Sequence, residues 1–329
     1  MKIFLTGGSG YLGRNFIEYA LSQNDQIKIN VLSRSSVSDE YIVKASEKVS
    51  NGDGRVKIIR GGIENIDVLK EGVNEADVIV HMAAKVNNWG YYEEFEKINV
   101  QGTLNLLNAI ESLNSNNTKS RRFVLISSFT AKLNNHYPND SLPDWAPYSK
   151  SKCLKEQTVI DKISAFSSIN EIIILRLGWI WGKDDTSLLP KLNDLSKNPL
   201  WKITPTSMKL SILHITNAIY EIKDDTEDIT MEEFIDFYVG TAYGIIPPKP
   251  FNSFRFSKGL VFNIVAFIEN IPFLNYAKSW VIGSICRESL VCIFKPYNLD
   301  NSKASSELGY VGKISREEGL IELKKYMKN

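Results

Sequence analysis

The segment Gly7-Gly8-Ser9-Gly10-Tyr11-Leu12-Gly13 decides the fold of this chain. It follows a short apolar run and opens a stretch whose apolar residues recur at helical spacing. Gly7 permits a tight bend after a strand, Gly10 lets the backbone approach a pyrophosphate, and Gly13 lets the helix pack close to the sheet. In this context of strand, turn and helix, the glycine spacing predicts a dinucleotide-binding turn.

Short β-branched runs alternate with polar, helix-like segments along the first half of the chain. The expected strands are 2–6, 27–32, 56–60, 78–82, 123–127 and 172–177, and the expected helices include 11–23, 93–113 and 148–163. This alternation predicts right-handed βαβ units, and nearly continuous apolar strands suit a sheet that is covered on both faces. We therefore predict an α/β fold, a Rossmann-type doubly wound parallel sheet with a smaller, mostly helical C-terminal substrate region.

The regular alternation weakens after Gly182, where prolines and aromatic residues become frequent. We predict a dinucleotide-binding Rossmann domain over residues 1–182, with a strand and helix at 208–223 returning to it. Residues 183–329 are then the substrate-binding region. Its expected helices lie near 231–243, 258–270 and 315–327.

The helix expected near 258–270 carries the apolar run 260–268. This run is too short to span a membrane, and Glu269 and Pro272 close it. We interpret it as a buried helix or as a wall of the substrate pocket. An interfacial helix that touches lipid is the alternative, and the sequence leaves it open.

The overall composition is that of a soluble globular protein. The chain has 329 residues, of which 43% are hydrophobic and 23% are charged, and its formal net charge is +1. This balance gives no electrostatic case for a nucleic-acid partner. Cys153, Cys286 and Cys292 form no CxxC pair and have no histidine at metal-ligand spacing. We expect no metal, reduced thiols and a cytoplasmic location; glycines interrupt the first apolar run, so no signal peptide is expected.

The residues after the second expected strand indicate which adenosine ribose the turn accepts. An acid there accepts a hydrogen bond from the 2′-hydroxyl of NAD, whereas a basic residue accommodates the 2′-phosphate of NADP. The sequence places Ser33, Arg34 and Ser35 at this point, with no acid before Asp39. We therefore expect NADP(H) to be the preferred cofactor, with NAD(H) as the alternative.

Tyr148 and Lys152 stand four residues apart at the start of an expected helix, so their side chains share a face. A tyrosine hydroxyl has an ordinary pKa of about 10, and a nearby ammonium favours the phenolate. Tyr148 would then exchange a proton with a substrate oxygen. Ser128 ends another expected strand, where a serine hydroxyl could hydrogen-bond the same oxygen.

Together these residues resemble the extended short-chain dehydrogenase/reductase family, the NAD(P)-dependent epimerases and dehydratases. Within it, the chain is most similar to the branch of the 3β-hydroxysteroid dehydrogenases and related ketone reductases. The resemblance spans nearly the whole chain, with the motifs in order. Besides the glycine turn, Ser128 and the Tyr148–Lys152 pair, the matching motifs are 81–84 (H-x-A-A), 99–107 (N-V-x-G-T-x-N-L-L), 175–182 (L-R-P-G-x-x-x-G), 302–310 and 315–320.

The resemblance implies an oxidoreductase that interconverts a carbonyl and a secondary or primary alcohol by hydride transfer. Tyr148 would be the acid/base, Lys152 would bind the nicotinamide ribose, and Ser128 would hold the substrate oxygen. The expected cofactor-binding residues are Gly7, Gly10, Tyr11, Leu12, Gly13, Ser33, Arg34, Ile63, Ala83, Ala84, Lys85, Ser127, Tyr148, Lys152 and Leu177. The expected pocket for an apolar small-molecule substrate includes Val86, Trp89, Phe129, Trp179 and Trp181, with Phe254 and Phe262 nearby.

The chain departs from the family pattern at three places. Leu177 stands where the family usually has a proline, and this difference would alter the conformation of the loop near the nicotinamide. Thr216-Asn217 stand where acids are frequent, and Gly62-Ile63-Glu64 replaces a more usual Gly-Asp pair. None of these departures touches the three expected catalytic residues.

Two other functions remain open from the sequence. One is a nucleotide-sugar epimerase or dehydratase with a retained cofactor, and the other is a non-catalytic NADP(H)-binding regulator. Phe129-Thr130 stand where dehydratases carry acids, and Arg34 disfavours an NAD-dependent epimerase. The Tyr148–Lys152 pair disfavours the regulator. The resemblance also leaves a homodimer open.

Overall fold

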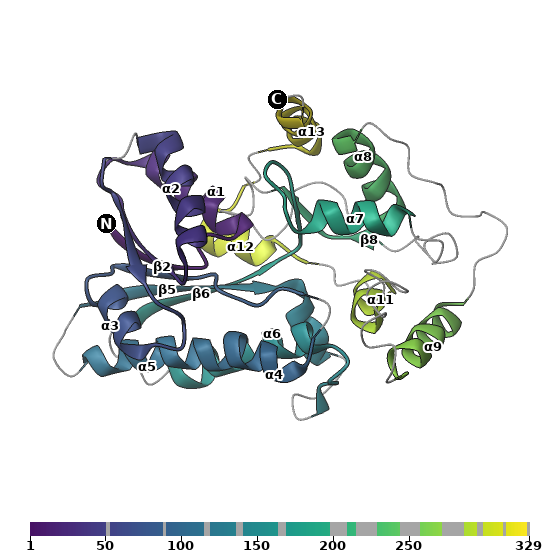
Figure 1. Ribbon diagram of the computed structural model, residues 1–329, viewed down its shortest axis with the longest axis horizontal. Coiled ribbons are helices and arrows are strands. Elements are labelled where there is room, and N and C mark those ends of the chain that lie inside the picture. Colours follow the sequence, from purple (N-terminus) through teal and green to yellow (C-terminus); the bar gives the residue numbers. More distant parts are fainter. Residues whose placement is uncertain are drawn as a thin grey trace. The chain divides into compact units, whose positions relative to one another are not determined.

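The structure is a computed structural model, and the chain divides into two compact units, Met1–Arg176 (unit 1) and Leu177–Asn329 (unit 2). Figure 1 follows the chain through both units. The structure describes residues 1–50, 53–87, 90–114, 119–135, 141–163, 169–197, 209–214, 229–243, 257–271, 286–294, 299–311 and 314–327.

Unit 1 alternates strands and helices in the manner that the sequence predicts. Its strands are β1 (Lys2–Thr6), β2 (Lys28–Ser33), β3 (Val56–Arg60), β4 (Val78–His81), β5 (Arg121–Ser128) and β6 (Ile169–Leu177). Its helices are α1 (Tyr11–Gln23), α2 (Ser36–Ser50), α3 (Ile66–Asn74), α4 (Tyr92–Phe95), the π-helical turn η1 (Glu96–Gln101), α5 (Gly102–Asn114), the 3₁₀ helix η2 (Phe129–Asn135) and α6 (Pro147–Ile163). The predicted Rossmann-type fold is confirmed.

The order of the strands places the switch point of the sheet, where this class of fold has its ligand crevice, at the carboxyl ends of β1 and β4. The six-stranded sheet has the order β3-β2-β1-β4-β5-β6, and β1 pairs in parallel with both β2 and β4. The chain builds outward from β1 to β3, then crosses back and builds outward from β4 to β6. In open α/β sheets this switch point is where ligands bind.

Alternate residues of β1 pack into two separate apolar layers, one on each face of the sheet. Phe4 belongs to the layer with α3, α5 and α6, which lie below the sheet in Figure 1. Ile3 and Leu5 belong to the layer with α1 and α2, which lie above it. Burying both faces explains why the strands are almost continuously apolar.

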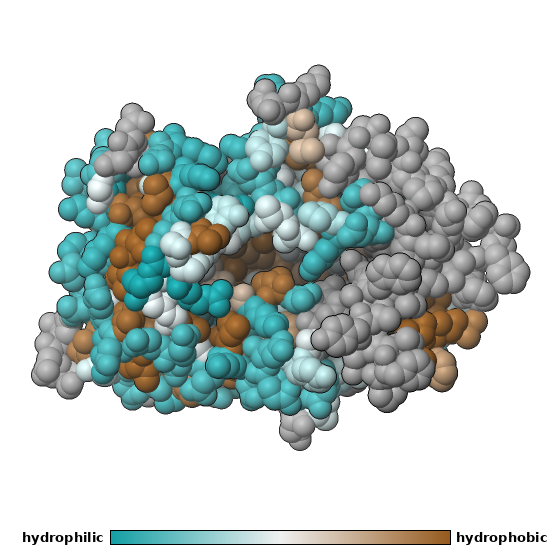
Figure 2. All heavy atoms as spheres, in the orientation of Figure 1, coloured by the Kyte–Doolittle hydropathy of each residue, from teal (hydrophilic) through white to brown (hydrophobic). Residues whose placement is uncertain are grey.

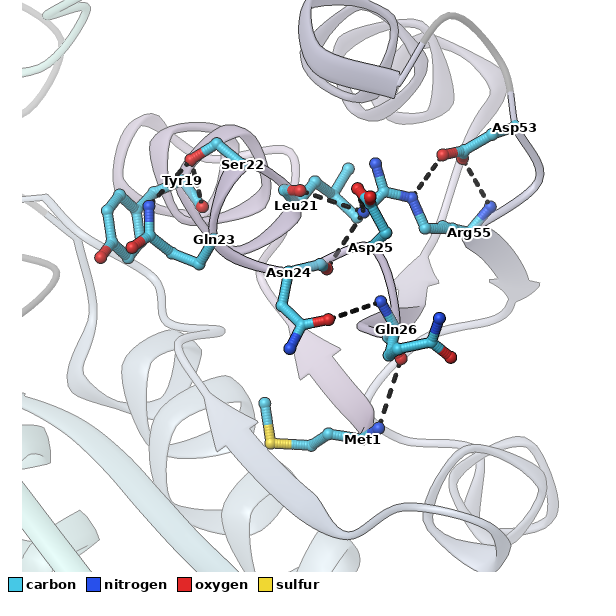
Figure 3. A network of polar contacts seen from close by, with 10 residues as sticks. All are labelled: Met1, Tyr19, Leu21, Ser22, Gln23, Asn24, Asp25, Gln26, Asp53 and Arg55. Atoms are coloured by element: carbon cyan, nitrogen blue, oxygen red, sulfur yellow. Dashed lines mark hydrogen bonds and ion pairs between the residues drawn. The ribbon is translucent and has the colours of Figure 1, made fainter.

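At the opposite, amino-terminal end of the sheet, Arg55 ties the segment before β3 to the turn between α1 and β2. Its guanidinium donates to the carbonyl oxygens of Leu21 and Asn24 at 3.0 and 3.2 Å, and it pairs with Asp53 (Figure 3). The backbone amide of Gln26, two residues after Asn24, donates to the Asn24 side-chain oxygen at 2.7 Å. These contacts fix the turn between α1 and β2 at the end of the sheet away from the crevice.

Unit 2 contains short strand pairs and several helices. Its strands are β7 (Trp179–Trp181), β8 (Lys209–Leu210), β9 (Ile212–His214) and β10 (Ile229–Thr230), and its helices are α7 (Leu188–Lys197), α8 (Met231–Tyr243), α9 (Lys258–Glu269), α11 (Arg287–Phe294), α12 (Ser302–Leu308) and α13 (Arg316–Met327). Strand β9 pairs in parallel with β7, and β10 pairs antiparallel with β8. The helix expected up to residue 223 lies outside the described residues, and the assignment of cofactor and substrate to separate domains stays a prediction.

An aromatic cluster forms the core of unit 2. The Trp181 ring is fully buried and meets the rings of Phe237 and Tyr238 edge-on, with centroids 5.6 and 5.7 Å apart. The Asp185 carboxylate accepts from the Tyr238 hydroxyl at 2.6 Å and also from the first amides of α7, including Leu188 at 2.9 Å. This aspartate therefore caps α7 and attaches it to α8.

Helix α9 has one buried face and one exposed apolar face. Val261 and Val265 are buried, whereas Leu260, Ile264 and Phe267 are exposed, with Phe267 at 71%. Figure 2 shows apolar atoms gathered where Figure 1 places α9. The helix is therefore buried on one side only, and lipid contact stays a prediction. Among the described residues, no helix is both long enough and apolar enough to cross a membrane.

Candidate active site

The glycine turn (Gly7–Gly13) joins β1 to α1 at the crevice. Gly7 has a φ of +80°, and a Cβ added to it would lie 2.7 Å from the backbone nitrogen of Ala83. A Cβ on Gly13 would lie 2.3 Å from the carbonyl oxygen of Gly7. Both positions therefore require glycine, because the turn, the helix and the end of β4 touch through their backbones.

The residues of this turn fit the pyrophosphate of a dinucleotide. Gly10 is the exposed N-cap of α1, no side chain caps the helix, and its first turn contains no acidic residue. The positive end of the helix dipole and the backbone amides at the start of α1 favour phosphate. Tyr11 and Leu12 begin the helix and are half-buried.

Two arginines and one acid lie where β2 and β3 end. Arg34 is exposed just after the buried Ser33, and no ion pair to Arg34 is found among the described residues. Ser33 is in register with Arg60 at the end of β3, and the Arg60 guanidinium pairs with Asp39. The first acid after β2 is therefore neutralised by an arginine that sequence reasoning missed, since only the pairing of β2 with β3 brings it there.

A buried hydrogen-bond network links the ends of β1 and β4 to α5. His81 is fully buried; its Nδ1 lies 2.7 Å from the Thr6 hydroxyl and its Nε2 lies 2.8 Å from the Thr103 hydroxyl. Thr103 donates its own proton to the Asn99 carbonyl at 2.6 Å, so it accepts from His81. Burial holds the pKa of His81 well below its usual value. The neutral imidazole carries its proton on Nε2, and Nδ1 accepts from Thr6.

Asn99 extends this network to the helix that carries Tyr148. Its side-chain oxygen accepts from the Lys85 amide at 2.7 Å, and its amide nitrogen donates to the Ser151 hydroxyl at 2.8 Å. Ser151 in turn donates to the Tyr148 carbonyl at 2.7 Å. The π-helical turn η1 that contains Asn99 thereby ties the loop after β4 to α6, so the glycine turn and the proposed catalytic helix share one rigid frame.

Lys152 lies beneath Tyr148, as their helical spacing predicts. The Lys152 ammonium is buried, donates to the Ile126 carbonyl at 3.2 Å, and lies 5.7 Å from the centroid of the Tyr148 ring. Burial lowers its pKa to about 8, and the charge of Glu156 opposes this shift. Since Ile126 is two residues before Ser128 on β5, the ammonium connects α6 to the strand that positions Ser128.

Glu156 anchors the same helix on its inner side. Its carboxylate accepts from the Ser127 hydroxyl and forms a two-pronged ion pair with Arg176, 2.6 Å at the closest approach. The bond to Glu156 raises the pKa of Arg176. Ser127, expected to bind cofactor, therefore already has a partner within unit 1, and its part in cofactor binding stays a prediction.

Lys155 is a fully buried lysine that sequence reasoning missed. Its amino group donates to the Ala83 carbonyl at 3.0 Å, in the loop expected to flank the cofactor. Burial, with a further contribution from the charge of Lys152, holds the pKa of Lys155 well below its usual value. The signal was present, since residues 148, 152 and 155 recur at the spacing of one helix face.

The buried lysines predict that stability rises with pH above neutrality. The folded protein releases the Lys155 proton at a lower pH than the unfolded chain, whose lysines titrate at about 10.4. Between the pKa of Lys155 in the folded protein and the pKa of a lysine in the unfolded chain, the unfolded chain binds more protons. The free energy of unfolding therefore increases with pH over this range. Lys152 acts in the same direction above about pH 8. Urea unfolding midpoints of Lys155→Met should rise less between pH 7 and pH 9.5 than those of the native chain.

A matched variant separates this effect from the loss of one charge. Lys150 lies on the same helix, but it is only partly buried and pairs with Asp144 at 2.6 Å. Lys150→Met should show the pH slope of the native chain. Equal slopes for Lys155→Met and the native chain would mean that Lys155 does not titrate differently on folding.

The remaining expected site residues have separate places. Ile63 is buried under Gly102 of α5, Val86 is 59% exposed, and Phe129 is buried beside Ser128. Leu177, Trp179 and Trp181 belong to unit 2, where Trp181 has the packing of a core residue. Phe262 lies half-buried on α9, and Trp89 and Phe254 lie outside the described residues. No group of three or more His, Cys, Asp or Glu suited to a metal ion occurs in the described part of the chain.

Two curated proteins match almost the full length of this chain. It is 27% identical over 348 residues to "Sterol-4-alpha-carboxylate 3-dehydrogenase, decarboxylating" of Dictyostelium discoideum, covering 98% of this chain and 99% of that protein. It is 27% identical over 347 residues to "4-hydroxy-2-methyl-3-oxo-4-farnesyl-3,4-dihydroquinoline-1-oxide ketoreductase" of Stigmatella aurantiaca, covering 98% and 96%. UDP-glucuronic acid 4-epimerase from Bacillus cereus, solved in complex with NAD, shares the fold with a TM-score of 0.67 and 20% identity over 100% and 97% of the two chains.

A parallel sheet with a glycine turn at its switch point, and a tyrosine above a buried lysine, defines an oxidoreductase that uses a nicotinamide dinucleotide. The comparisons with known proteins identify its family. The chain belongs to the NAD dependent epimerase/dehydratase family, whose model matches residues 3–198. The predicted family, and with it the branch that includes ketone reductases, is confirmed by these relatives.

Proposed function

We propose that the protein is an NADP(H)-dependent enzyme that interconverts a ketone and a secondary alcohol on an apolar small molecule. The observation that carries this proposal is the Lys152 ammonium, buried beneath the Tyr148 ring and bonded to the strand that ends in Ser128. A buried cation in this place favours the phenolate form of the tyrosine, which is the state a proton acceptor needs.

Ser128, Tyr148 and Lys152 then have separate roles at the substrate oxygen. When bound, the cofactor supplies or accepts the hydride at the substrate carbon. Ser128 donates a hydrogen bond to the substrate oxygen, and Tyr148 gives that oxygen a proton during reduction or takes one during oxidation. Lys152 keeps the negative charge of the phenolate favourable. The glycine turn and the first amides of α1 hold the pyrophosphate, and the Asn99 network fixes α6 against them.

The names of the two relatives support an apolar ketone or alcohol. One is a 3-dehydrogenase of a sterol carboxylate, and the other is a ketoreductase of a farnesylated 3-oxo compound. In this chain the apolar Phe129 follows Ser128 directly, and no acid occupies the next position, Thr130. This arrangement suits reduction at a carbonyl and supplies no carboxylate for the elimination step of a dehydratase.

A panel of carbonyl compounds tests the proposal. Purified protein is mixed with NADPH or NADH and with sterol-like 3-ketones, prenylated cyclic ketones, short polar ketones or nucleotide sugars, and cofactor absorbance is followed. We expect turnover with NADPH and the apolar ketones. Turnover of a nucleotide sugar with cofactor retained through gel filtration, and no turnover of any ketone, would overturn the proposal in favour of an epimerase.

The preference for NADP(H) is proposed from Arg34 and Arg60. Both arginines lie at the strand ends that face the adenosine ribose in this fold, and Asp39 is already paired with Arg60. Replacing Arg34 by Ala should weaken NADPH binding about 10- to 100-fold, the worth of one or two charge-assisted hydrogen bonds. NADH binding should change about 3-fold or less. Fluorescence titration with each cofactor measures both values.

Arg122→Ala is the matched control for this variant. Arg122 is another exposed arginine, at the start of β5, paired with Glu171 at 2.6 Å, and it lies at the other end of the sheet. It should leave both affinities unchanged. If Arg34→Ala weakens NADPH and NADH equally, Arg34 does not recognise the 2′-phosphate.

We further propose a reducing, cytoplasmic location. None of the three cysteines forms a disulfide and all three are buried, which is consistent with a chain kept in a reducing compartment. Association into a homodimer stays a prediction of the family resemblance.

A further inference from the structure

The hydroxyl of Ser128 receives two hydrogen bonds from a single neighbour. Thr130 donates to the Ser128 Oγ both through its hydroxyl, at 3.0 Å, and through its backbone amide, at 3.3 Å. Both side chains are buried, with 8% and 4% of their surface exposed, so water does not compete freely for these bonds. Thr130 is the second residue of the 3₁₀ helix η2 and lies two residues after Ser128, and the tight turn of this helix brings both of its donors onto one oxygen.

The bonds from Thr130 leave the Ser128 hydroxyl with its proton to donate and no lone pair with which to accept. A serine hydroxyl has one proton to donate and two lone pairs that accept. Thr130 occupies both lone pairs. The proton of Ser128 has no acceptor among the described residues, so it is the part of the group that remains for a ligand.

We propose that Thr130 is a positioning residue that commits Ser128 to donate its proton to the substrate oxygen. The inference rests on the proposed function and deepens it. A ketone oxygen, and the negative charge that develops on it as hydride arrives, are both acceptors, so a serine restricted to donation is matched to them. An alcohol bound for oxidation meets no free lone pair on Ser128. The alcohol cannot donate its proton to Ser128 in an unproductive hydrogen bond. The Tyr148 phenolate is therefore the acceptor left for that proton.

The donor arrangement can be tested without any substrate. Neutron diffraction of exchanged crystals of the full chain locates the deuteron on each hydroxyl. We expect the deuteron of Thr130 to lie on the line to the Ser128 Oγ. A deuteron that lies on Ser128 and points to Thr130 would overturn the proposal, whatever the outcome for the proposed function.

Kinetics of variants test the consequence. Thr130→Val keeps the shape and the backbone amide but removes the hydroxyl donor. It should lower kcat for ketone reduction about 5- to 20-fold, the worth of one hydrogen bond, with the KM for NADPH unchanged. Thr130→Ser, which restores a hydroxyl, should recover most of the loss. A Thr130→Ser variant as slow as Thr130→Val would assign the effect to packing and overturn the proposal.

A double-mutant cycle separates action through Ser128 from a general structural role. In a Ser128→Ala background the target of the Thr130 hydroxyl is gone, so adding Thr130→Val should change kcat by less than about 2-fold. The same 5- to 20-fold loss in both backgrounds would show that Thr130 acts elsewhere and overturn the proposal. An absence of turnover in the native chain would instead count against the proposed function, and the neutron result would still decide the donor arrangement.

Discussion

Replacing Tyr148 by Phe should lower kcat about 10²- to 10⁴-fold while NADPH binding stays within about 2-fold of the native value. The substitution removes only the hydroxyl, so the ring stays above Lys152 and the frame of α6 is kept. The loss is the usual contribution of a positioned acid or base to a proton transfer. Steady-state kinetics with the best ketone and a fluorescence titration with NADPH measure the two effects separately.

Tyr19→Phe is the matched control. Tyr19 lies on α1 near the amino-terminal end of the sheet, in the group of residues drawn in Figure 3. It should have no effect on turnover. Native turnover in Tyr148→Phe would remove Tyr148 from its assigned role, and an equal loss of turnover and NADPH binding would give the hydroxyl a structural role instead.

Replacing Gly7 by Ala should have the second large effect, on both stability and cofactor binding. An alanine at this position must adopt a φ of +80°. Its Cβ would lie 2.7 Å from the backbone nitrogen of Ala83, a contact that no side-chain movement relieves. Strain and overpacking together should lower the free energy of unfolding by about 2–4 kcal/mol. Displacement of the turn should weaken NADPH binding about 100-fold or more. Urea unfolding and NADPH titration measure the two changes.

Gly54→Ala isolates the backbone strain from the contact. Gly54 also has a positive φ, +74°, but a Cβ there would meet nothing within 4 Å. It should cost about 1 kcal/mol and leave NADPH binding unchanged. If Gly7→Ala behaves like Gly54→Ala in both measurements, the close approach of the turn to the end of β4 has no part in binding.

The parts of the fold that depend on local sequence are predictable. The glycine turn, the strand before it and the helix after it occupy consecutive residues, and their predicted bounds agree with β1 and α1. Tyr148 and Lys152 are likewise related by one turn of a helix, so their common face follows from spacing alone. The buried residues of the first strands follow from their apolar runs.

The contacts between distant segments are not predictable in the same way. Arg60 reaches Asp39 because β3 pairs with β2 in one particular register. The His81 imidazole meets Thr6 and Thr103 because the switch in strand order places β4 beside β1. No spacing in the sequence encodes these partners. The same register leaves the first acid after β2, Asp39, in an ion pair with Arg60.

Residue type alone is a weak guide to a substrate pocket. Trp181, one of the residues expected to line it, is fully buried and packs edge-on against Phe237 and Tyr238 of α8, and its part in the pocket stays a prediction. An aromatic side chain in a small helical unit fills the core as readily as it lines a pocket. Sequence alone does not distinguish these two uses.

The transfer of deuterium from the cofactor tests the central claim most directly. NADPH is labelled with deuterium at C4 of the nicotinamide, on either face in separate preparations, and is turned over with the best apolar ketone. The account predicts one deuterium on the carbinol carbon of the product from one of the two labelled forms and none from the other, measured by mass spectrometry. A product that contains no deuterium from either form would contradict it, because hydride transfer at the site of Ser128, Tyr148 and Lys152 would not occur.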